Sequence, residues 1–593
     1  MNKNTLLAFV LIMLTVLFFN SEIWNRFYHE RIMNQPYVVE NTEEKENAQQ
    51  SVKGEREVSE NAVKTEKVTE ESKAQTEPEE VQFEKDTIVV ETDRFIATIS
   101  SEGGRIISLL MKEYTQDGEM IEIVPEDGVG GAQLSINNKS YNETIFNIVD
   151  EQESYVFVGE DPYVLVMETT QDGEAIRKIF TFSNESYKIG YDVEGDNLSG
   201  SKVGIGWLGG INEPEASNGG IGAPAEQRRV HYYNGNTVQH MRMSREGTEE
   251  SSGRYKWIGT TSKYFFINLI SDSVRDMDVT INAFETERRD ANNNKIEEIN
   301  YSLKLNTFAE SNRLSNFIYA GPTDYRELRS HESNYEKVLF PVLGWTRHIL
   351  WADSWFPPLA EFVLRVLLFL QGIVKDYGIA ILILTLLMRL ATYPLTHSST
   401  KSMNRMREVQ PKINALRQKY KSNPQKMNTE LMALYKAEGI NPLNPGCLPM
   451  FLQMPIFISL FVVLRKAIEL RGAGTVLFPW ISDLSQPETL ISLPFSLPVY
   501  GASIALLPIL MGVLTYFQNK MTIKDPNQKM MIYIMPIFML VLFNNFPAGL
   551  VLYWTTSSGL QLLQQFITRS KGKYVASSVP VKTNKDKRKT VKR

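Results

Sequence analysis

The sequence is poor in the residue types on which metal and redox sites depend. Its 593 residues include one cysteine, Cys447, and six histidines. A single cysteine cannot form a disulfide within the chain, so it gives no information about the redox state of the compartment. No nucleotide-binding motif is present either. We therefore predict a protein without a metal or cofactor, and one that is not an enzyme.

Carboxylates are missing from the apolar stretches of the C-terminal part. Five stretches are long and apolar enough to span a bilayer, and none contains Asp or Glu. They are residues 377–395, 448–464, 500–518, 530–546 and 548–567. A secondary transporter is the first alternative function for such a bundle. It is disfavoured because it needs a coupling carboxylate and typically an inverted repeat, and neither is found.

The first stretch contains a single charge, Arg389. A charge at membrane depth costs free energy, so it is rare and usually functional. With no carboxylate in the five stretches to neutralise it, this arginine indicates a site that receives a polar or acidic peptide. The alternative is snorkelling. Arg389 lies about 9 Å from the inner end of the stretch by helix rise, and its side chain could nearly reach the interface from there.

The N-terminal part predicts an anchor followed by a tether. Residues 1–28 contain an apolar run without a small-residue cleavage site, which indicates an uncleaved signal anchor with a cytoplasmic N-terminus. Residues 29–84 are predicted to be a disordered acidic tether. Within them, residues 38–82 lack aromatic side chains and cannot bury enough apolar surface to fold.

Residues 85–325 alternate short β-type runs with turn signals such as Asn234-Gly235. This pattern predicts a large all-β sandwich, placed outside the cytoplasm by the anchor before it. An enzyme in this domain is a second alternative, because large β-sandwiches can bind sugars. Glu226, His231 and His240 are available for chemistry, but no recognisable spacing joins them. A scaffold or partner-docking role is favoured.

Residues 340–374 predict an amphipathic helix that lies in the outer membrane interface. Glu361, Arg365 and Gln371 interrupt its apolar run, so an interfacial position fits better than a span.

The fold class predicted from these segments has two parts. One is a polytopic α-helical membrane bundle of six transmembrane helices, five of which form a core within residues 375–570. The other is the extracytoplasmic all-β sandwich. The loop 396–446 carries nine Lys and Arg against three Glu, and the tail 571–593 is strongly basic. Both features place the two termini in the cytoplasm. The tail can be attracted to lipid or contact the ribosome, and the sequence leaves both open.

The loop 396–446 has two helical stripes of apolar residues, separated by Ser422-Asn423-Pro424. The first comprises Met403, Met406, Val409, Ile413, Leu416 and Tyr420, and the second comprises Met427, Leu431, Leu434 and Tyr435. They predict a cytoplasmic helical hairpin with a Met-rich seam. A loop that serves topology alone is the alternative, but it needs no such stripes. We therefore predict substrate capture by Met403, Met406, Arg407, Met427 and Leu431.

Several sequence strings resemble the YidC family of bacterial membrane protein insertases, in the family's order between about residues 340 and 570. They are Arg389-Leu-Ala-Thr-Tyr-Pro-Leu, Met406-Arg-Glu-Val-Gln-Pro-Lys-Ile, Leu434-Tyr-Lys-Ala-Glu-Gly-Ile-Asn-Pro-Leu, Cys447-Leu-Pro-Met-Phe-Leu-Gln-Met-Pro-Ile-Phe and Phe546-Pro-Ala-Gly-Leu-Val-Leu-Tyr-Trp. The anchor and β domain resemble the Gram-negative form, although residues 85–325 match by position and β character alone.

The resemblance implies five spans around a hydrophilic groove that opens to the cytoplasm and to lipid. It implies that Arg389 lies in this groove, with Thr385 one helical turn before it. Tyr553 and Trp554 would line the groove from the last span, where Trp554 departs from the commoner second tyrosine. An aromatic belt is the alternative for this pair. Gln453 is also assigned to the groove, with a hydrogen bond between helices as its alternative.

The resemblance further implies a function in the cell inner membrane, with residues 29–374 mostly periplasmic. The chain would insert, fold and help assemble membrane proteins, alone or with the Sec translocon. The implied partners are nascent membrane proteins, the Sec translocon, the ribosome and membrane lipids, without sequence-specific nucleic acid. An obligate Sec accessory that lacks autonomous insertase activity is the remaining alternative.

Overall fold

The computed structural model describes residues 87–570 apart from short internal gaps. The gaps are residues 117, 127–128, 150–153, 172, 215–227, 244, 290–294, 332–333, 341–351, 439–447, 498–499 and 524–528. The predicted anchor, tether and basic tail lie outside the described residues, so those predictions stay predictions. For residues 394–407 and 448–453 the structure describes the backbone alone.

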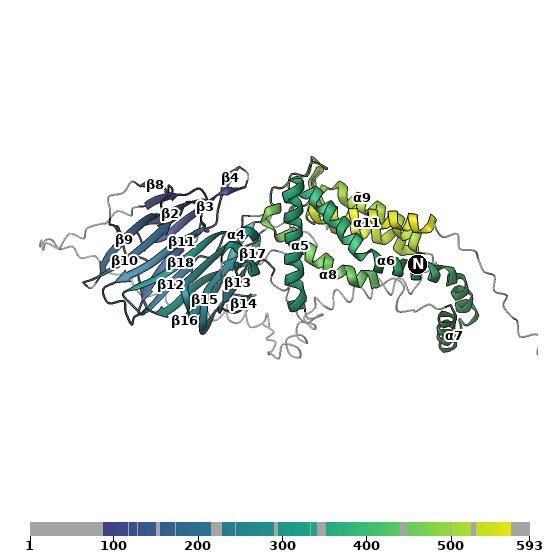
Figure 1. Ribbon diagram of the computed structural model, residues 1–593, viewed down its shortest axis with the longest axis horizontal. Helices are drawn as coiled ribbons and strands as arrows, with labels where there is room; N and C mark the ends of the chain where they lie inside the picture. The colour runs from purple at the N-terminus through teal and green to yellow at the C-terminus, as the bar shows by residue number, and fades with distance from the viewer. Residues whose placement is uncertain are drawn as a thin grey trace, which may run out of the picture. The chain divides into compact units, whose positions relative to one another are not determined.

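The part of the chain from Thr87 to Pro322 forms an 18-stranded sheet (Figure 1). Its strands are β1 (Thr87–Glu91), β2 (Phe95–Ser100), β3 (Arg105–Gln116), β4 (Glu119–Glu122), β5 (Gly130–Ile136), β6 (Lys139–Ser140), β7 (Asn147–Ile148), β8 (Tyr155–Phe157), β9 (Tyr163–Gln171), β10 (Glu174–Phe182), β11 (Lys188–Gly195), β12 (Lys202–Leu208), β13 (Arg229–Tyr233), β14 (Val238–Met241), β15 (Gly247–Thr261), β16 (Phe265–Arg289), β17 (Lys295–Phe308) and β18 (Arg313–Pro322). Among these described strands, only β1 and β8 pair in parallel. The predicted sheet-rich character of this region is confirmed for the residues that the structure describes.

Two rows of strands meet on the long strand β16. One row runs β9–β10–β11–β18 and reaches β16 through residues 265–271. The other runs β1–β2–β3–β5–β12–β17 and reaches β16 through residues 278–289. Strand β15 pairs along most of β16, so both strands extend from one row into the other. This arrangement encloses a core that contains the fully buried Trp207 and Trp257.

The buried face of strand β10 carries a lysine, Lys178, among apolar residues. Ile176, Lys178, Phe180 and Phe182 alternate toward the core. The ammonium of Lys178 donates to the carbonyl oxygens of Gly103 at 2.6 Å and Ala132 at 2.7 Å. It also donates to the Gly104 carbonyl, so three carbonyls satisfy its three donors. Burial nevertheless holds the pKa of Lys178 well below its ordinary value.

Short helices and one long apolar helix follow the sheet. They are α4 (Tyr325–Ser330), the 3-10 helix η2 (Tyr335–Val338) and α5 (Ala352–Val374). Within the described residues, Phe356–Val374 is the one helical stretch whose length and composition would allow it to cross a membrane, while Tyr377–Tyr393 and Met530–Phe543 are apolar but shorter. Because length and composition do not separate a spanning helix from an interfacial one, the interfacial position of 340–374 stays a prediction.

The remaining elements form the helical part (Figure 1). They are α6 (Tyr377–Lys419), α7 (Pro424–Ala437), α8 (Leu448–Lys466), the 3-10 helix η3 (Ile468–Leu470), β19 (Ile491–Leu497), β20 (Gly501–Ile504), α9 (Leu506–Thr522), α10 (Lys529–Phe543) and α11 (Ala548–Ser570). The predicted stretch 500–518 becomes helical only at Leu506, where α9 begins. The preceding residues 501–504 form β20, which pairs with β19. Helix α11 contacts α6, α8 and α9, which places it centrally among them. The predicted organisation into a sheet-rich part and a helical part is confirmed.

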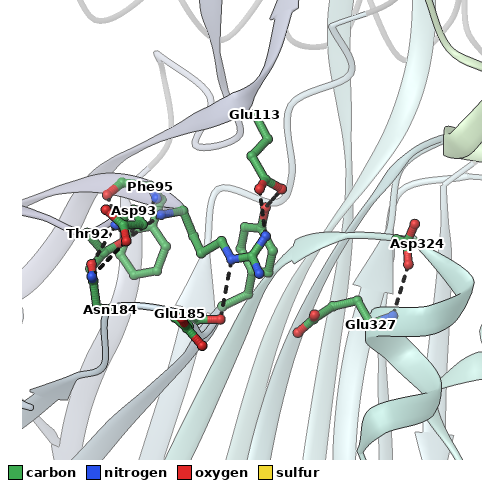
Figure 2. Close-up of polar contacts among 10 residues, drawn as sticks. Thr92, Asp93, Phe95, Glu113, Asn184, Glu185, Asp324 and Glu327 are labelled. Carbon is green, nitrogen blue, oxygen red and sulfur yellow. Dashed lines mark hydrogen bonds and ion pairs between the residues drawn. The ribbon is translucent and has the colours of Figure 1, made fainter. Parts of the chain in front are cut away.

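The buried carboxyl group of Glu469 lies next to the start of α4. Asp324 caps this helix by accepting the backbone N–H groups of Arg326 and Glu327. Figure 2 shows the contact with Glu327. Glu469 in η3 accepts the N–H of Tyr325 with Oε1 at 3.0 Å, while its enclosed Oε2 has no hydrogen-bond partner. Burial, together with the nearby charge of Asp324, raises the pKa of Glu469 from 4.5 to about 7.

Replacing Glu469 by glutamine is expected to stabilise the protein at neutral pH. A raised carboxyl pKa means that the folded state holds this proton at pH values where the unfolded chain has lost it. The free energy of unfolding therefore falls as the pH rises from 4.5 to about 7, by at most about 3 kcal/mol. Thermal unfolding in detergent between pH 4 and 8 should show a weaker pH dependence in Glu469→Gln. Parallel profiles of variant and wild type would contradict this account.

Candidate functional site

Arg389 lies on the face of α6 that packs against α11. Its Nη2 donates to the carbonyl oxygen of Ser557 at 2.8 Å and to the Ser557 Oγ at 2.7 Å. The same nitrogen lies 3.2 Å from Oε1 of Gln561. All three acceptors are neutral and belong to α11. In the part of the chain that the structure describes, no carboxylate forms an ion pair with Arg389, and its buried Nε has no acceptor.

A small pocket surrounds this contact between the helices. Residues of α6, α8 and α11 line it, namely Thr385, Met388, Arg389, Thr392, Ile456, Tyr553 and Ser557. The structure thus brings together three of the predicted groove residues, Arg389, Thr385 and Tyr553. They come from segments more than 160 positions apart in the chain, so the pocket depends on the packing of α6 against α11.

Two hydroxyl groups of the pocket are bonded within α6 itself. Thr385 is fully buried, and its Oγ1 donates to the carbonyl of Ile381 at 2.6 Å. The Oγ1 of Thr392 donates to the carbonyl of Met388 at 2.9 Å. Such bonds to the preceding turn satisfy a hydroxyl in an apolar helix. Thr385 therefore shapes the pocket wall, while Arg389 supplies its charge.

The two aromatic residues predicted to line the groove lie in different places. Tyr553 is buried and lines the pocket. Trp554 instead packs edge-on against Phe457, with ring centroids 4.8 Å apart, and lies 5.2 Å from the ring of Phe543. Neighbouring residues on a helix point about 100° apart, so they cannot both face one narrow pocket. Gln453 belongs to α8, but its side chain is among those that the structure does not describe.

Sequence reasoning missed Ser557 and Gln561. A signal was present, because Tyr553, Ser557 and Gln561 recur every four residues and so share one face of α11. The motif that ends at Trp554 covers only the first two turns of this helix. The polar residues beyond it were not connected with Arg389.

The predicted cytoplasmic hairpin corresponds to the end of α6 and to α7. Val409 and Ile413 of α6 are buried, and Leu431, Leu434 and Tyr435 of α7 pack against them. Met427 is half-buried, whereas Met432 is 60% exposed. The backbones of Met403, Met406 and Arg407 belong to α6, and their side chains are not described. The predicted capture role of these residues stays a prediction.

The candidate polar groups of the β domain come together in part. Across the β13–β14 pair, Nδ1 of His231 lies 2.7 Å from Nδ1 of His240. Nε2 of His231 also lies 2.9 Å from Oγ1 of Thr261, and burial holds the pKa of His231 well below its ordinary value. Glu226 lies outside the described residues. Within the described chain, no three His, Cys, Asp or Glu side chains are grouped to hold a metal ion.

Comparisons with known proteins match both parts of the chain. The family described as "60Kd inner membrane protein" matches residues 369–575, and the family described as "YidC periplasmic domain" matches residues 87–349. The "Membrane protein insertase YidC" of Chloroherpeton thalassium is 33% identical over 504 residues, which cover 82% of each chain. That of Chlorobium limicola is 34% identical over 515 residues, covering 82% of this chain and 83% of the relative.

A solved structure, "Active YidC insertase crystal structure with the first transmembrane domain resolved", covers 82% of this chain and 93% of its own. It is 21% identical to this chain, with a TM-score of 0.36.

Proposed function

This chain belongs to the YidC family of membrane protein insertases, and from that premise we propose that it inserts membrane proteins through the pocket around Arg389. One observation carries the proposal. Arg389 lies in an apolar helix, its Nη2 contacts neutral groups of α11, and its buried Nε has no acceptor. A guanidinium in this state can accept a further, negatively charged partner.

The obstacle to insertion is the polar segment that must cross before the apolar span is released into lipid. Each backbone or side-chain group left unsatisfied in hydrocarbon costs several kcal/mol. A polar pocket partway into the membrane shortens the path over which the segment lacks partners. The hydroxyl and amide groups of Ser557 and Gln561 on α11 supply such partners, and Arg389 supplies the attraction for a carboxylate.

The pairing between Arg389 and a substrate carboxylate is transient in this mechanism. Attraction between the two charges is stronger at low dielectric than in water. The membrane potential then draws an acidic segment outward, so the substrate leaves the pocket on the far side. The apolar span of the substrate moves into lipid along the neighbouring helices. These steps require no nucleotide.

The finer topology belongs to the same proposal. The bundle has six transmembrane helices, five of them in its core, and both chain termini lie in the cytoplasm. The β domain lies in the periplasm as a sandwich, which the meeting of its two strand rows on β16 supports. Nascent membrane proteins are the substrates. The Sec translocon, the ribosome and membrane lipids are proposed partners.

The test is insertion of a small single-span protein with an acidic polar segment into proteoliposomes that contain this purified protein alone. Protease protection of the translocated segment gives the readout. Insertion above the level of empty liposomes supports an autonomous insertase. Insertion that occurs only after adding the Sec translocon identifies an obligate accessory, and ion-dependent solute uptake in the same vesicles would favour a transporter.

A further inference from the structure

We propose that Gln561, together with Ser557, positions Arg389 through neutral acceptors and thereby makes the pocket selective for acidic polar segments. This inference rests on the proposed insertase function. It assigns a specificity-determining role to a side chain on α11 that contacts Arg389. The substrate class that it selects is an extended polar segment carrying Asp or Glu near the span.

The contacts of the guanidinium are uneven. Three acceptor atoms from Ser557 and Gln561 surround Nη2, which has only two hydrogens to donate. Nε is buried and has no acceptor at all. Nη2 therefore fixes the guanidinium against α11, while Nε still lacks a hydrogen-bond acceptor. Once the side chains that line the pocket move apart to admit it, a carboxylate can bind this donor without displacing the contacts that fix the guanidinium.

The neutrality of the acceptors determines what the pocket attracts. A carboxylate in the place of the Gln561 amide would lie at the same distance from Nη2 and would form an internal ion pair. The positive charge of Arg389 would then be compensated before a substrate arrives. An amide accepts the hydrogen bond but leaves the charge in place, so glutamine is the long side chain here that positions the arginine without neutralising it.

Ser557 and Gln561 make different kinds of contact with Arg389. Ser557 is buried and contacts Nη2 through both its carbonyl and its hydroxyl oxygen. Because the carbonyl belongs to the backbone, this contact survives most side-chain substitutions. Gln561 lies one turn further along α11 and makes the longest of the three contacts, at 3.2 Å. Its side chain can therefore be exchanged while Ser557 still holds Arg389.

The decisive experiment compares Gln561→Glu with Gln561→Met in proteoliposomes, using two substrates that differ only in Asp or Asn residues of the polar segment. Gln561→Glu is expected to abolish the preference for the acidic substrate, while insertion of the neutral one remains. Gln561→Met is expected to weaken the preference without abolishing it, because it removes one acceptor that positions Arg389 but adds no charge, and Ser557 still contacts Nη2. Gln518→Glu on α9, away from the pocket lining, serves as the matched control and should keep the preference.

The outcomes separate this inference from the function on which it rests. If wild type shows no preference, or Arg389→Ala leaves the preference intact, the proposed charge selection by Arg389 fails. If Arg389→Ala removes the preference but Gln561→Glu retains it, the role of Gln561 alone is wrong. If both Gln561 variants reduce the preference equally, the neutrality of the acceptor has no effect, and that part of the inference is wrong. Should Gln561→Glu not fold, Gln561→Met still tests the positioning role, because an unchanged preference in this variant would contradict it.

Discussion

Replacing Arg389 by alanine is expected to reduce insertion of acidic substrates roughly tenfold, which corresponds to about 1.4 kcal/mol in the barrier. This is a modest part of the roughly 4 kcal/mol between two charges 4 Å apart at an effective dielectric constant of about 20. The smaller figure allows for the desolvation of the substrate carboxylate. Substrates with Asn in place of Asp should lose little, because the remaining polar groups of the pocket can still pair with them.

The helical part should tolerate this substitution. Ser557 can bond within α11 once the guanidinium is gone, and Gln561 is only half-buried. Removing a charge from an apolar helix also removes its desolvation cost. Thermal unfolding in detergent therefore serves as the control and should change little or shift upward. Arg389→Lys keeps the charge but loses the planar donor geometry, so it should retain part of the acidic preference.

An equal loss of insertion for acidic and neutral substrates would contradict the pairing mechanism. Such a result would instead assign Arg389 a general role in keeping the pocket polar or in joining α6 to α11. The snorkelling alternative makes a different forecast, since an arginine directed to the interface would leave both substrates unaffected when removed. The paired substrates thus distinguish three roles of the same side chain.

The two-part organisation was predictable because each part follows a simple periodicity. The turn signal Asn234-Gly235, for example, lies between strands β13 and β14, which pair with each other. The break predicted at Ser422-Asn423-Pro424 agrees with the end of α6 at Lys419 and the start of α7 at Pro424. Local signals of this kind depend on neighbouring residues, which the sequence displays directly.

Features that depend on residues far apart in the sequence could not be predicted in the same way. The first span and the first arm of the hairpin were read as separate helices, whereas the structure joins them in the 43-residue helix α6. The basic residues after position 395 end the apolar run, but polarity alone does not end a helix. The contact of Arg389 with Ser557 depends on how α6 packs against α11. No periodicity within either helix specifies that packing.

Lys178 and Glu469 illustrate the same limit for charged residues. Alternation along β10 would place residue 178 inward, yet a sequence reader assigns a lysine to the surface. Its partners are the carbonyls of Gly103, Gly104 and Ala132, which lie 46 to 75 positions away. Glu469 likewise follows a predicted span as an ordinary loop residue, and its burial depends on the start of α4. Burial of a charge is set by tertiary partners that the local sequence does not name.

Opening the seam between α6 and α7 is expected to impair the proposed substrate capture strongly. Ile413 is 1% exposed and forms the centre of the small cluster with Val409. Replacing it by aspartate places a charge in that seam, at a cost of roughly 2–5 kcal/mol from lost burial and desolvation. Since few residues hold α7 against α6, this cost should separate the two arms. Photo-crosslinking of a nascent substrate to the protein would measure the loss of capture.

Met432→Asp is the matched control, because this side chain of α7 is 60% exposed and the same charge there remains in solvent. Deletion of residues 403–437 should reproduce the loss seen with Ile413→Asp, while protease accessibility shows that the bundle is still inserted. If crosslinking to the deletion variant equals that of wild type, the hairpin has no part in capture and its basic residues serve topology alone. If the deletion impairs capture and Ile413→Asp does not, the hairpin acts through its charges, and its paired form is not required.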